Sequence, residues 1–232
     1  MLKKLIKAFG NRYVQAICRR EYQTQEFNPN ERAVELAFLF RHLARLAPHT
    51  VLDVGTGLTP TPSAIRLCGF EVTAIDNVKD YWPKGIANRH FHVLDEDVTQ
   101  TRLNRKFDFI ACISTLEHID KHDDAIRSMA RLLNPGGHIV LTLPYNEQQY
   151  VSNVYDLPDS SAHDAGYGFS TQAYSHKEVQ QWLADTGLRL MEQEYWQFFT
   201  GPYWTVGTQL KVPRLSSPNE LHQLSCLLLQ AP

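Results

Sequence analysis

Short apolar runs alternate along this chain with longer stretches in which apolar residues recur every three or four positions. The short runs are typical of buried β-strands, and the longer stretches are typical of amphipathic helices. Strands that alternate with helices predict an α/β fold, a doubly wound parallel sheet with helices on both faces. The expected strands are residues 50–54, 70–75, 90–94, 107–113, 138–143, 188–199 and 221–229.

Helices are expected before the first strand and between the later ones. The last of them has the clearest ends, because Ser175 and Glu178 form a capping box and Gly187 stops the helix. The expected helices are residues 31–47, 60–68, 121–133 and 175–186.

Two stretches interrupt this alternation. Residues 144–174 are rich in Tyr, Asn, Asp, Ser and Gly and have no clear period. A loop of this length in a compact domain is usually a functional lid or a disordered segment. Its five tyrosines and Phe169 argue against disorder, so we expect it to shape a substrate site. Residues 201–218, with Tyr203 and Trp204, are expected either to contribute to that site or to form a homodimer contact.

The first 30 residues form a separate segment before the domain expected at 31–232. Residues 1–9 are basic and amphipathic, and they lack the longer apolar region of a signal peptide. We expect residues 1–30 to form a helical cap on the domain. A weak contact of residues 1–9 with a membrane surface is the alternative interpretation.

Composition narrows the class of protein. The chain has 232 residues and a net charge of −2, so no basic surface for nucleic acid is indicated. Its four cysteines are scattered, which indicates neither a disulfide framework nor a zinc ribbon. No stretch approaches the roughly 20 apolar residues of a membrane span. A cytoplasmic protein is expected.

One motif indicates a cofactor. Residues 51–57, Val-Leu-Asp-Val-Gly-Thr-Gly, predict a buried strand followed by a glycine turn, and a second strand ends at Asp76. This unit binds the adenosine part of a cofactor, with the acid on the ribose hydroxyls. Pro60 stands where the dinucleotide pattern has its third glycine, and Pro62 follows. Prolines have no N–H to offer a pyrophosphate, which disfavours NAD and FAD.

Further motifs follow in order along the chain and resemble those of class I S-adenosylmethionine-dependent methyltransferases, most closely the broad small-molecule group. The resemblance covers about residues 31–200 and implies S-adenosylmethionine as cofactor. It also implies a Rossmann-like seven-stranded sheet whose strand 7 is antiparallel and lies between strands 5 and 6. The motifs are residues 51–57, 74–76, 95–98, 107–110 with 116–119, and 132–139.

The same resemblance implies roles for individual residues. Asp76 is expected to bind the ribose, with Asn77 beside the adenine. Asp97 is expected to contact the adenine amino group, and Val98 its ring. The full implied cofactor set is Asp53, Gly55, Thr56, Gly57, Asp76, Asn77, Asp97, Val98, Ile113 and Ser114. Thr59 replaces the family's third glycine, so Arg32 or Tyr22 is an alternative anchor for the cofactor's amino-acid end.

Two histidines are candidate catalytic groups for methyl transfer to an O, N or C atom of a small-molecule acceptor. His118 follows the fourth strand at the mouth of the pocket and is a candidate general base; the alternative is a residue that only lines the pocket. His163 lies in the lid segment, where a solvated loop histidine is the alternative. Some related O-methyltransferases bind a metal next to such a Glu-His pair, but Ser114 replaces the glutamate needed, so no metal is expected.

Two other functions remain open from the sequence. A non-catalytic relative that keeps the fold and binds the cofactor is suggested by the altered glycine loop. An NAD(P)-dependent oxidoreductase is disfavoured by Pro60 and by the absence of a Tyr-x-x-x-Lys pair.

Overall fold

The computed structural model describes residues 2–25, 29–78, 88–163, 166 and 168–232. It divides into two compact units, residues 1–30 and residues 31–232, and each is described by itself. The first unit contains α1 (Leu2–Gln23), a helix of 22 residues that continues well beyond the basic stretch 1–9. That residues 1–30 cap the domain stays a prediction.

The second unit alternates strands and helices in the expected order. Its capping box at Ser175 and Glu178 and the left-handed Gly187 after α6 are as predicted. The helices are α2 (Arg32–Leu46), α3 (Thr61–Leu67), α5 (His122–Leu132) and α6 (His176–Thr186), with short 3₁₀ turns η1 (Val98–Gln100), η2 (Leu116–His118) and η3 (Val154–Asp156). The strands are β1 (Thr50–Val54), β2 (Glu71–Asp76), β3 (Val93–Asp95), β4 (Phe107–Ile113), β5 (Leu133–Pro144), β6 (Arg189–Phe199), β7 (Gln209–Ser216) and β8 (Leu224–Gln230).

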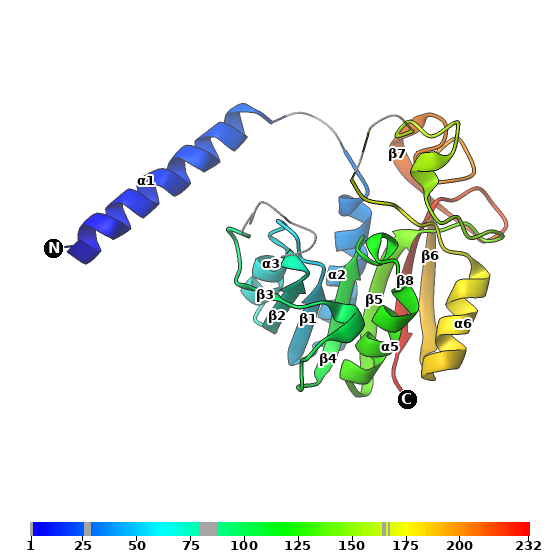
Figure 1. The fold of residues 1–232 in the computed structure, drawn as a ribbon, viewed down its shortest axis with the longest axis horizontal. Helices are drawn as coiled ribbons and strands as arrows, with labels where there is room; N and C mark the ends of the chain where they lie inside the picture. Colours follow the sequence, from blue (N-terminus) through cyan, green and yellow to red (C-terminus); the bar gives the residue numbers. More distant parts are fainter. Residues whose placement is uncertain (1, 26–28, 79–87, 164–165, 167) are drawn as a thin grey trace. The chain divides into compact units, whose positions relative to one another are not determined.

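All these strands form one sheet, in the order β3-β2-β1-β4-β5-β8-β6-β7 (Figure 1). β1 to β5 pair in parallel, whereas β8 is antiparallel to both β5 and β6. The α/β class, the doubly wound sheet and the antiparallel strand between the fifth and sixth strands are therefore confirmed. The sheet contains one strand more than the seven expected among the described residues, because β7 forms part of residues 201–218 and pairs with β6.

Three strand boundaries differ from the sequence prediction. β3 spans three residues, Val93–Asp95, and not 90–94. β5 begins at Leu133 because residues 134–137 form an irregularity in the strand, where the pairing with β4 shifts from Phe107↔Leu133 to Phe109↔His138. β7 has no alternating apolar pattern and includes Pro213, which has no N–H to donate, so its sequence predicted no strand.

The sheet is covered on both faces, as a doubly wound fold requires. Side chains of β1 alternate between two cores: Val51 packs with Phe38 of α2, and Leu52 packs with Met129 of α5 and Trp182 of α6. In Figure 1, α5 and α6 lie in front of the sheet and α2 lies behind it. The strand ends between these layers are left open at the carboxyl edge of the sheet, where open α/β sheets bind ligands.

Candidate functional site

A pocket of about 570 Å³ lies at the carboxyl ends of β1, β2 and β4. Its volume is in the range of small-molecule sites, about 300–1,000 Å³, and its position is the switch point where the strand order reverses. All ten residues predicted to bind the cofactor line this pocket, and so does the candidate base His118. The other lining residues used below are Arg32, Leu36, Thr59, Glu96, Thr115 and Phe169.

The turn after β1 requires glycine for two physical reasons. Gly55 and Gly57 have positive φ values, 73° and 54°, which favour glycine. A Cβ on Gly55 would also lie 2.0 Å from Cγ2 of Thr115, which leaves no room for a side chain. Gly57 donates its N–H to Oδ2 of Asp76 over 2.5 Å. The turn therefore holds the Asp76 carboxylate at the pocket wall while keeping its own backbone accessible to a ligand.

The proline-containing loop that departs from the family pattern is held by side chains. Nδ2 of Asn88 donates to the carbonyl oxygens of Gly57 and Thr59, at 2.9 Å each. The hydroxyl of Thr59 donates to the carbonyl of Thr56 over 2.8 Å. α3 begins at Thr61, and Pro62 lies in its first turn. Because proline has no N–H, this position offers no hydrogen-bond donor to a ligand in the pocket. The loop fits a cofactor without a pyrophosphate. The sequence contained no motif that would identify Asn88.

Three of the acids that line the pocket have different surroundings. Asp53 is buried and accepts a hydrogen bond from the Thr56 hydroxyl over 2.6 Å, and burial raises its pKa to about 6. Asp97 accepts from both the N–H and the hydroxyl of Thr99, at 2.8 Å each. Glu96 also lines the pocket and is held by Arg102, with Nη2 3.1 Å from its Oε1. Glu96 therefore remains an alternative to Asp97 for the contact with the adenine amino group.

A buried acid supports the opposite wall of the pocket. Glu35 of α2 is 0 % exposed, and its Oε1 accepts from the hydroxyls of Ser114, at 2.5 Å, and Thr142, at 2.7 Å. Its Oε2 pairs with Nη1 of Arg32 over 2.7 Å. Ser114 itself has a φ of 42°, an uncommon conformation that is frequent at functional sites. Sequence reasoning missed Glu35, and the only indication was its spacing three residues after Arg32.

His118 is held in one tautomer. Its Nδ1 lies 2.8 Å from the carbonyl oxygen of Ser170. A carbonyl only accepts, so Nδ1 has the proton and the lone pair of the neutral ring is on Nε2. Burial lowers the pKa of His118, although its hydrogen bond to Ser170 acts in the opposite direction. The ring also packs edge-on against Phe169, with centroids 4.9 Å apart.

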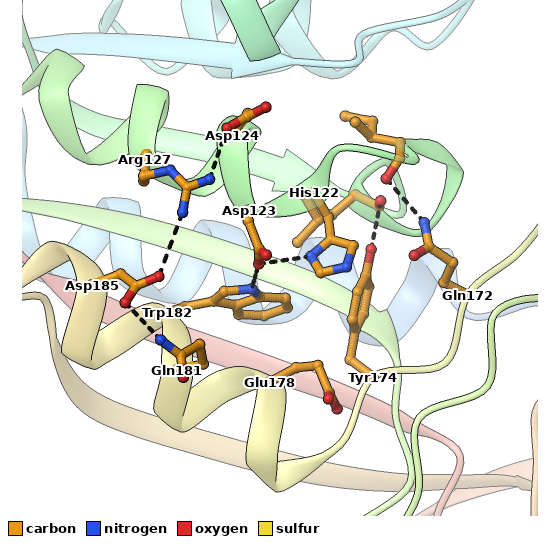
Figure 2. A network of polar contacts seen from close by, with 12 residues as sticks. His122, Asp123, Asp124, Arg127, Gln172, Tyr174, Glu178, Gln181, Trp182 and Asp185 are labelled. Carbon is orange, nitrogen blue, oxygen red and sulfur yellow. Dashed lines mark hydrogen bonds and ion pairs between the residues drawn. The ribbon is translucent and has the colours of Figure 1, made fainter.

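Gln172 and Tyr174, at the end of the lid segment, hydrogen-bond to the turn η2 and to the residue that follows it (Figure 2). Nε2 of Gln172 donates to the carbonyl of Ile119 over 2.9 Å, and the Tyr174 hydroxyl donates to the carbonyl of Leu116 over 2.8 Å. The Tyr174 ring packs edge-on against Trp182 of α6, at 4.9 Å. These contacts fix the backbone that presents Ser170 to His118 and Phe169 to the pocket.

The structure does not bring His163 to the pocket. His163 is exposed, does not line the cavity, and its Nδ1 lies 3.3 Å from the carbonyl oxygen of Tyr155. Its neighbours Asp164 and Tyr167 lie outside the described residues.

The described residues contain no group of three or more His, Cys, Asp or Glu side chains arranged to hold a metal ion. In the same part of the chain, no helix has the length and apolar character needed to cross a membrane.

Known proteins share this fold. The N-methyltransferase NodS of Bradyrhizobium japonicum, crystallised with S-adenosylhomocysteine, superposes with a TM-score of 0.51 at 19 % identity, over 89 % of this chain and 90 % of that one. The 1,6-didemethyltoxoflavin-N1-methyltransferase of Burkholderia thailandensis, with bound 1,6-didemethyltoxoflavin and S-adenosylhomocysteine, gives 0.56 at 16 %, over 98 % and 89 %. At these identities the two structures establish the fold.

Sequence comparison gives a closer grouping. The ubiquinone biosynthesis O-methyltransferase of Proteus mirabilis is 25 % identical in an alignment of 184 residues, and the match covers 71 % of this chain and 71 % of that one. Residues 22–193 match the family described as methyltransferase domain. The predicted enzyme class, an S-adenosylmethionine-dependent methyltransferase acting on a small molecule, is thereby confirmed. By this match over most of its length, the chain belongs to the methyltransferase domain family.

Proposed function

We propose that this enzyme methylates a hydroxyl oxygen of a small, largely apolar acceptor, with His118 as the general base. The observation that supports the proposal is the 2.8 Å hydrogen bond from Nδ1 of His118 to the Ser170 carbonyl. This bond selects the tautomer with an accepting Nε2, in a side chain that lines the pocket. Burial also lowers the pKa of His118, which favours the unprotonated ring that a general base requires.

The chemistry needs little beyond orientation and one proton acceptor. Bound S-adenosylmethionine would supply a methyl group attached to a sulfonium sulfur, and the sulfur is the leaving group of an in-line displacement at the methyl carbon. In the proposed step, Nε2 of His118 accepts the hydroxyl proton of the acceptor as its oxygen forms the new bond to the methyl carbon. The electron pair of the broken carbon–sulfur bond stays on sulfur. Ser170 keeps the His118 ring oriented throughout this proton transfer.

Two apolar side chains of the pocket lining support an apolar acceptor. Phe169, which packs against His118, and Leu36 both line the pocket, where they offer an aromatic face and an aliphatic contact. The relatives from ubiquinone biosynthesis are named O-methyltransferases, which favours oxygen as the atom methylated here. The Burkholderia enzyme holds a small heterocyclic substrate, which favours a small acceptor over a macromolecule.

The cofactor residues keep their proposed roles. Asp76, held by Gly57, is assigned to the ribose hydroxyls, and Asp97 with Val98 to the adenine. Arg32 is assigned to the carboxylate of the cofactor's amino-acid end, a role that the family's third glycine does not fill here. Its position beside Ser114 and its pairing with buried Glu35 support this assignment.

Two measurements test the proposal. Calorimetric titration with S-adenosylhomocysteine and with NAD is expected to show binding of the sulfur compound and none of NAD; the reverse would exclude the cofactor assignment. Incubation with S-adenosylmethionine and a panel of catechols, hydroxybenzoates and matched aromatic amines, followed by mass spectrometry, is expected to give methylated hydroxyls. Methylation of the amines alone would contradict the oxygen assignment.

A further inference from the structure

α1 has a continuous apolar stripe along one side. At 100° per residue, six large apolar side chains of this 22-residue helix fall within one sector, and Asn11 and Gln15 fall on the opposite side. Val14 and Tyr22 lie outside the sector, and Arg20 lies within it near the end of the helix. The stripe extends over most of the helix and includes two aromatic rings. It consists of Leu2, Leu5, Ile6, Phe9, Tyr13 and Ile17.

The helix also concentrates positive charge. It contains six basic residues and one acid, Glu21, whereas the other 210 residues contain 17 basic and 24 acidic residues. The net charge of −2 for the whole chain therefore hides a strongly positive helix joined to a negative domain. The basic residues of α1 are Lys3, Lys4, Lys7, Arg12, Arg19 and Arg20.

Within the described residues of the unit 1–30, no second helix or strand packs against this stripe. α1 is its one helix among the described residues, and a lone helix cannot bury its own apolar side. Helices that stand alone are marginal in water, and Gly10 in the middle weakens this one further. A partner with an apolar layer beside negative charge would satisfy both features of α1.

We propose that α1 binds the surface of an anionic phospholipid bilayer, lying in the interface with its stripe among the acyl chains. An amphipathic helix with a basic polar face and with Phe and Leu on the other face has this behaviour. Lys and Arg beside the stripe meet the negative lipid headgroups. The proposal rests on α1 alone and not on the function proposed above.

The length of α1 distinguishes this proposal from the contact of residues 1–9 suggested by the sequence. The stripe runs from Leu2 to Ile17 and is therefore about 24 Å long, at about 1.5 Å per residue. Arg12, Arg19 and Arg20 add charge beyond the first nine residues. We therefore assign Leu2–Ile17, together with the basic residues that follow it in α1, to the membrane contact.

Flotation of the full chain with vesicles tests the proposal. Vesicles of equal parts phosphatidylcholine and phosphatidylglycerol are expected to bind the chain at least tenfold more tightly than vesicles of phosphatidylcholine alone, and added salt is expected to weaken the binding. Helical circular dichroism is expected to rise when the anionic vesicles are added. Equal binding to both vesicles, or to neither, would overturn the proposal.

A pair of variants with equal charge separates the stripe from the charge. Ile6→Glu with Phe9→Glu places two acids in the stripe, whereas Asn11→Glu with Gln15→Glu places two on the polar face. The first pair is expected to lose at least tenfold in binding to anionic vesicles, and the second pair much less. Unchanged titration of S-adenosylhomocysteine would show that both variants keep a folded domain.

Two other occupants of the stripe would each overturn the proposal. A concentration-dependent dimer that is lost in the Ile6→Glu, Phe9→Glu variant, without vesicle binding by the wild type, would show a second copy. A lower melting temperature of that variant, again without vesicle binding by the wild type, would show that α1 packs on its own domain.

Discussion

The two sides of the pocket are built from contacts of very different range. On the cofactor side, Asp53 bonds to Thr56 three residues away, and Asp76 bonds to Gly57 at a separation of 19. At the methionine end of the cofactor, Glu35 joins residues 79 and 107 positions away, and on the acceptor side His118 is oriented by a carbonyl 52 residues away. The adenosine end of the pocket is thus specified by short motifs, and the methionine end and the acceptor side by the packing of the whole domain.

This difference has a functional consequence. Local motifs keep the adenosine subsite constant on one fold, while long-range contacts allow the acceptor subsite to change with the lid. Variants on the acceptor side should therefore alter turnover, and variants on the cofactor side should alter cofactor affinity.

The largest effect is expected on the acceptor side. His118→Ala is expected to lower kcat by about 10² to 10⁴, the usual contribution of a positioned general base, with cofactor affinity unchanged. The matched control is His163→Ala, which is expected to leave kcat unchanged because His163 lies outside the pocket. Equal losses in both variants would remove the distinction between the two histidines.

The pH profile sharpens this prediction. His118 is a base only when unprotonated, so kcat/KM should fall as the pH drops through its pKa. Burial lowers that pKa below the ordinary value of 6.5, so the midpoint of the fall should lie below that of an exposed histidine. The acid fall should be absent from the residual rate of His118→Ala.

A smaller effect is expected on the cofactor side. Asp76→Ala should weaken S-adenosylhomocysteine binding by at least tenfold, because hydrogen bonds to a charged group contribute about 1.5–3 kcal/mol. Asp76→Asn keeps the shape and serves as the comparison for the loss of charge. Calorimetric titration measures both. Unchanged affinity in Asp76→Ala would refute the ribose assignment.

The last prediction concerns the free energy of unfolding and not activity. Glu117 is buried and, among the described residues, its Oε2 has no hydrogen-bond partner. Burial raises its pKa from 4.5 to about 8, so the folded chain holds this proton more tightly than the unfolded chain. Stability should therefore fall as the pH rises from about 4.5 to about 8.

Glu117→Gln removes this loss, because the amide has no proton to lose. The variant should gain about 2–4 kcal/mol relative to the wild type between pH 5 and pH 9, the order expected for a buried unpaired charge. Urea unfolding at the two pH values measures the difference. An identical pH dependence in both proteins would show that the Glu117 carboxylate is stabilised when charged.

The elements of the fold that are specified by nearby residues could be predicted from the sequence, and those that depend on distant contacts could not. The alternation of apolar runs and helical periods was enough for the sheet and its helices, since each strand is specified within a few residues. β7 was missed because edge pairing compensates for a sequence with Pro213 and no apolar period. The start of β5 was missed because residues 134–137 resemble a turn and are absorbed into the strand.

The residues of the candidate site show the same difference between short motifs and distant contacts. All ten cofactor residues were located at the pocket from short motifs. Glu35 was not, because an acid inside a helix pattern resembles a solvated position until Ser114 and Thr142 are seen to donate to it. The tautomer of His118 also depends on Ser170, whose position only the folded lid segment determines.

A crystal structure of the full chain with S-adenosylhomocysteine tests the division of the pocket most directly. The account predicts ribose hydroxyls within hydrogen-bond distance of the Asp76 carboxylate, adenine beside Asp97 and Val98, and sulfur directed toward Nε2 of His118. Adenine beside Phe169, or sulfur directed away from His118, would contradict it.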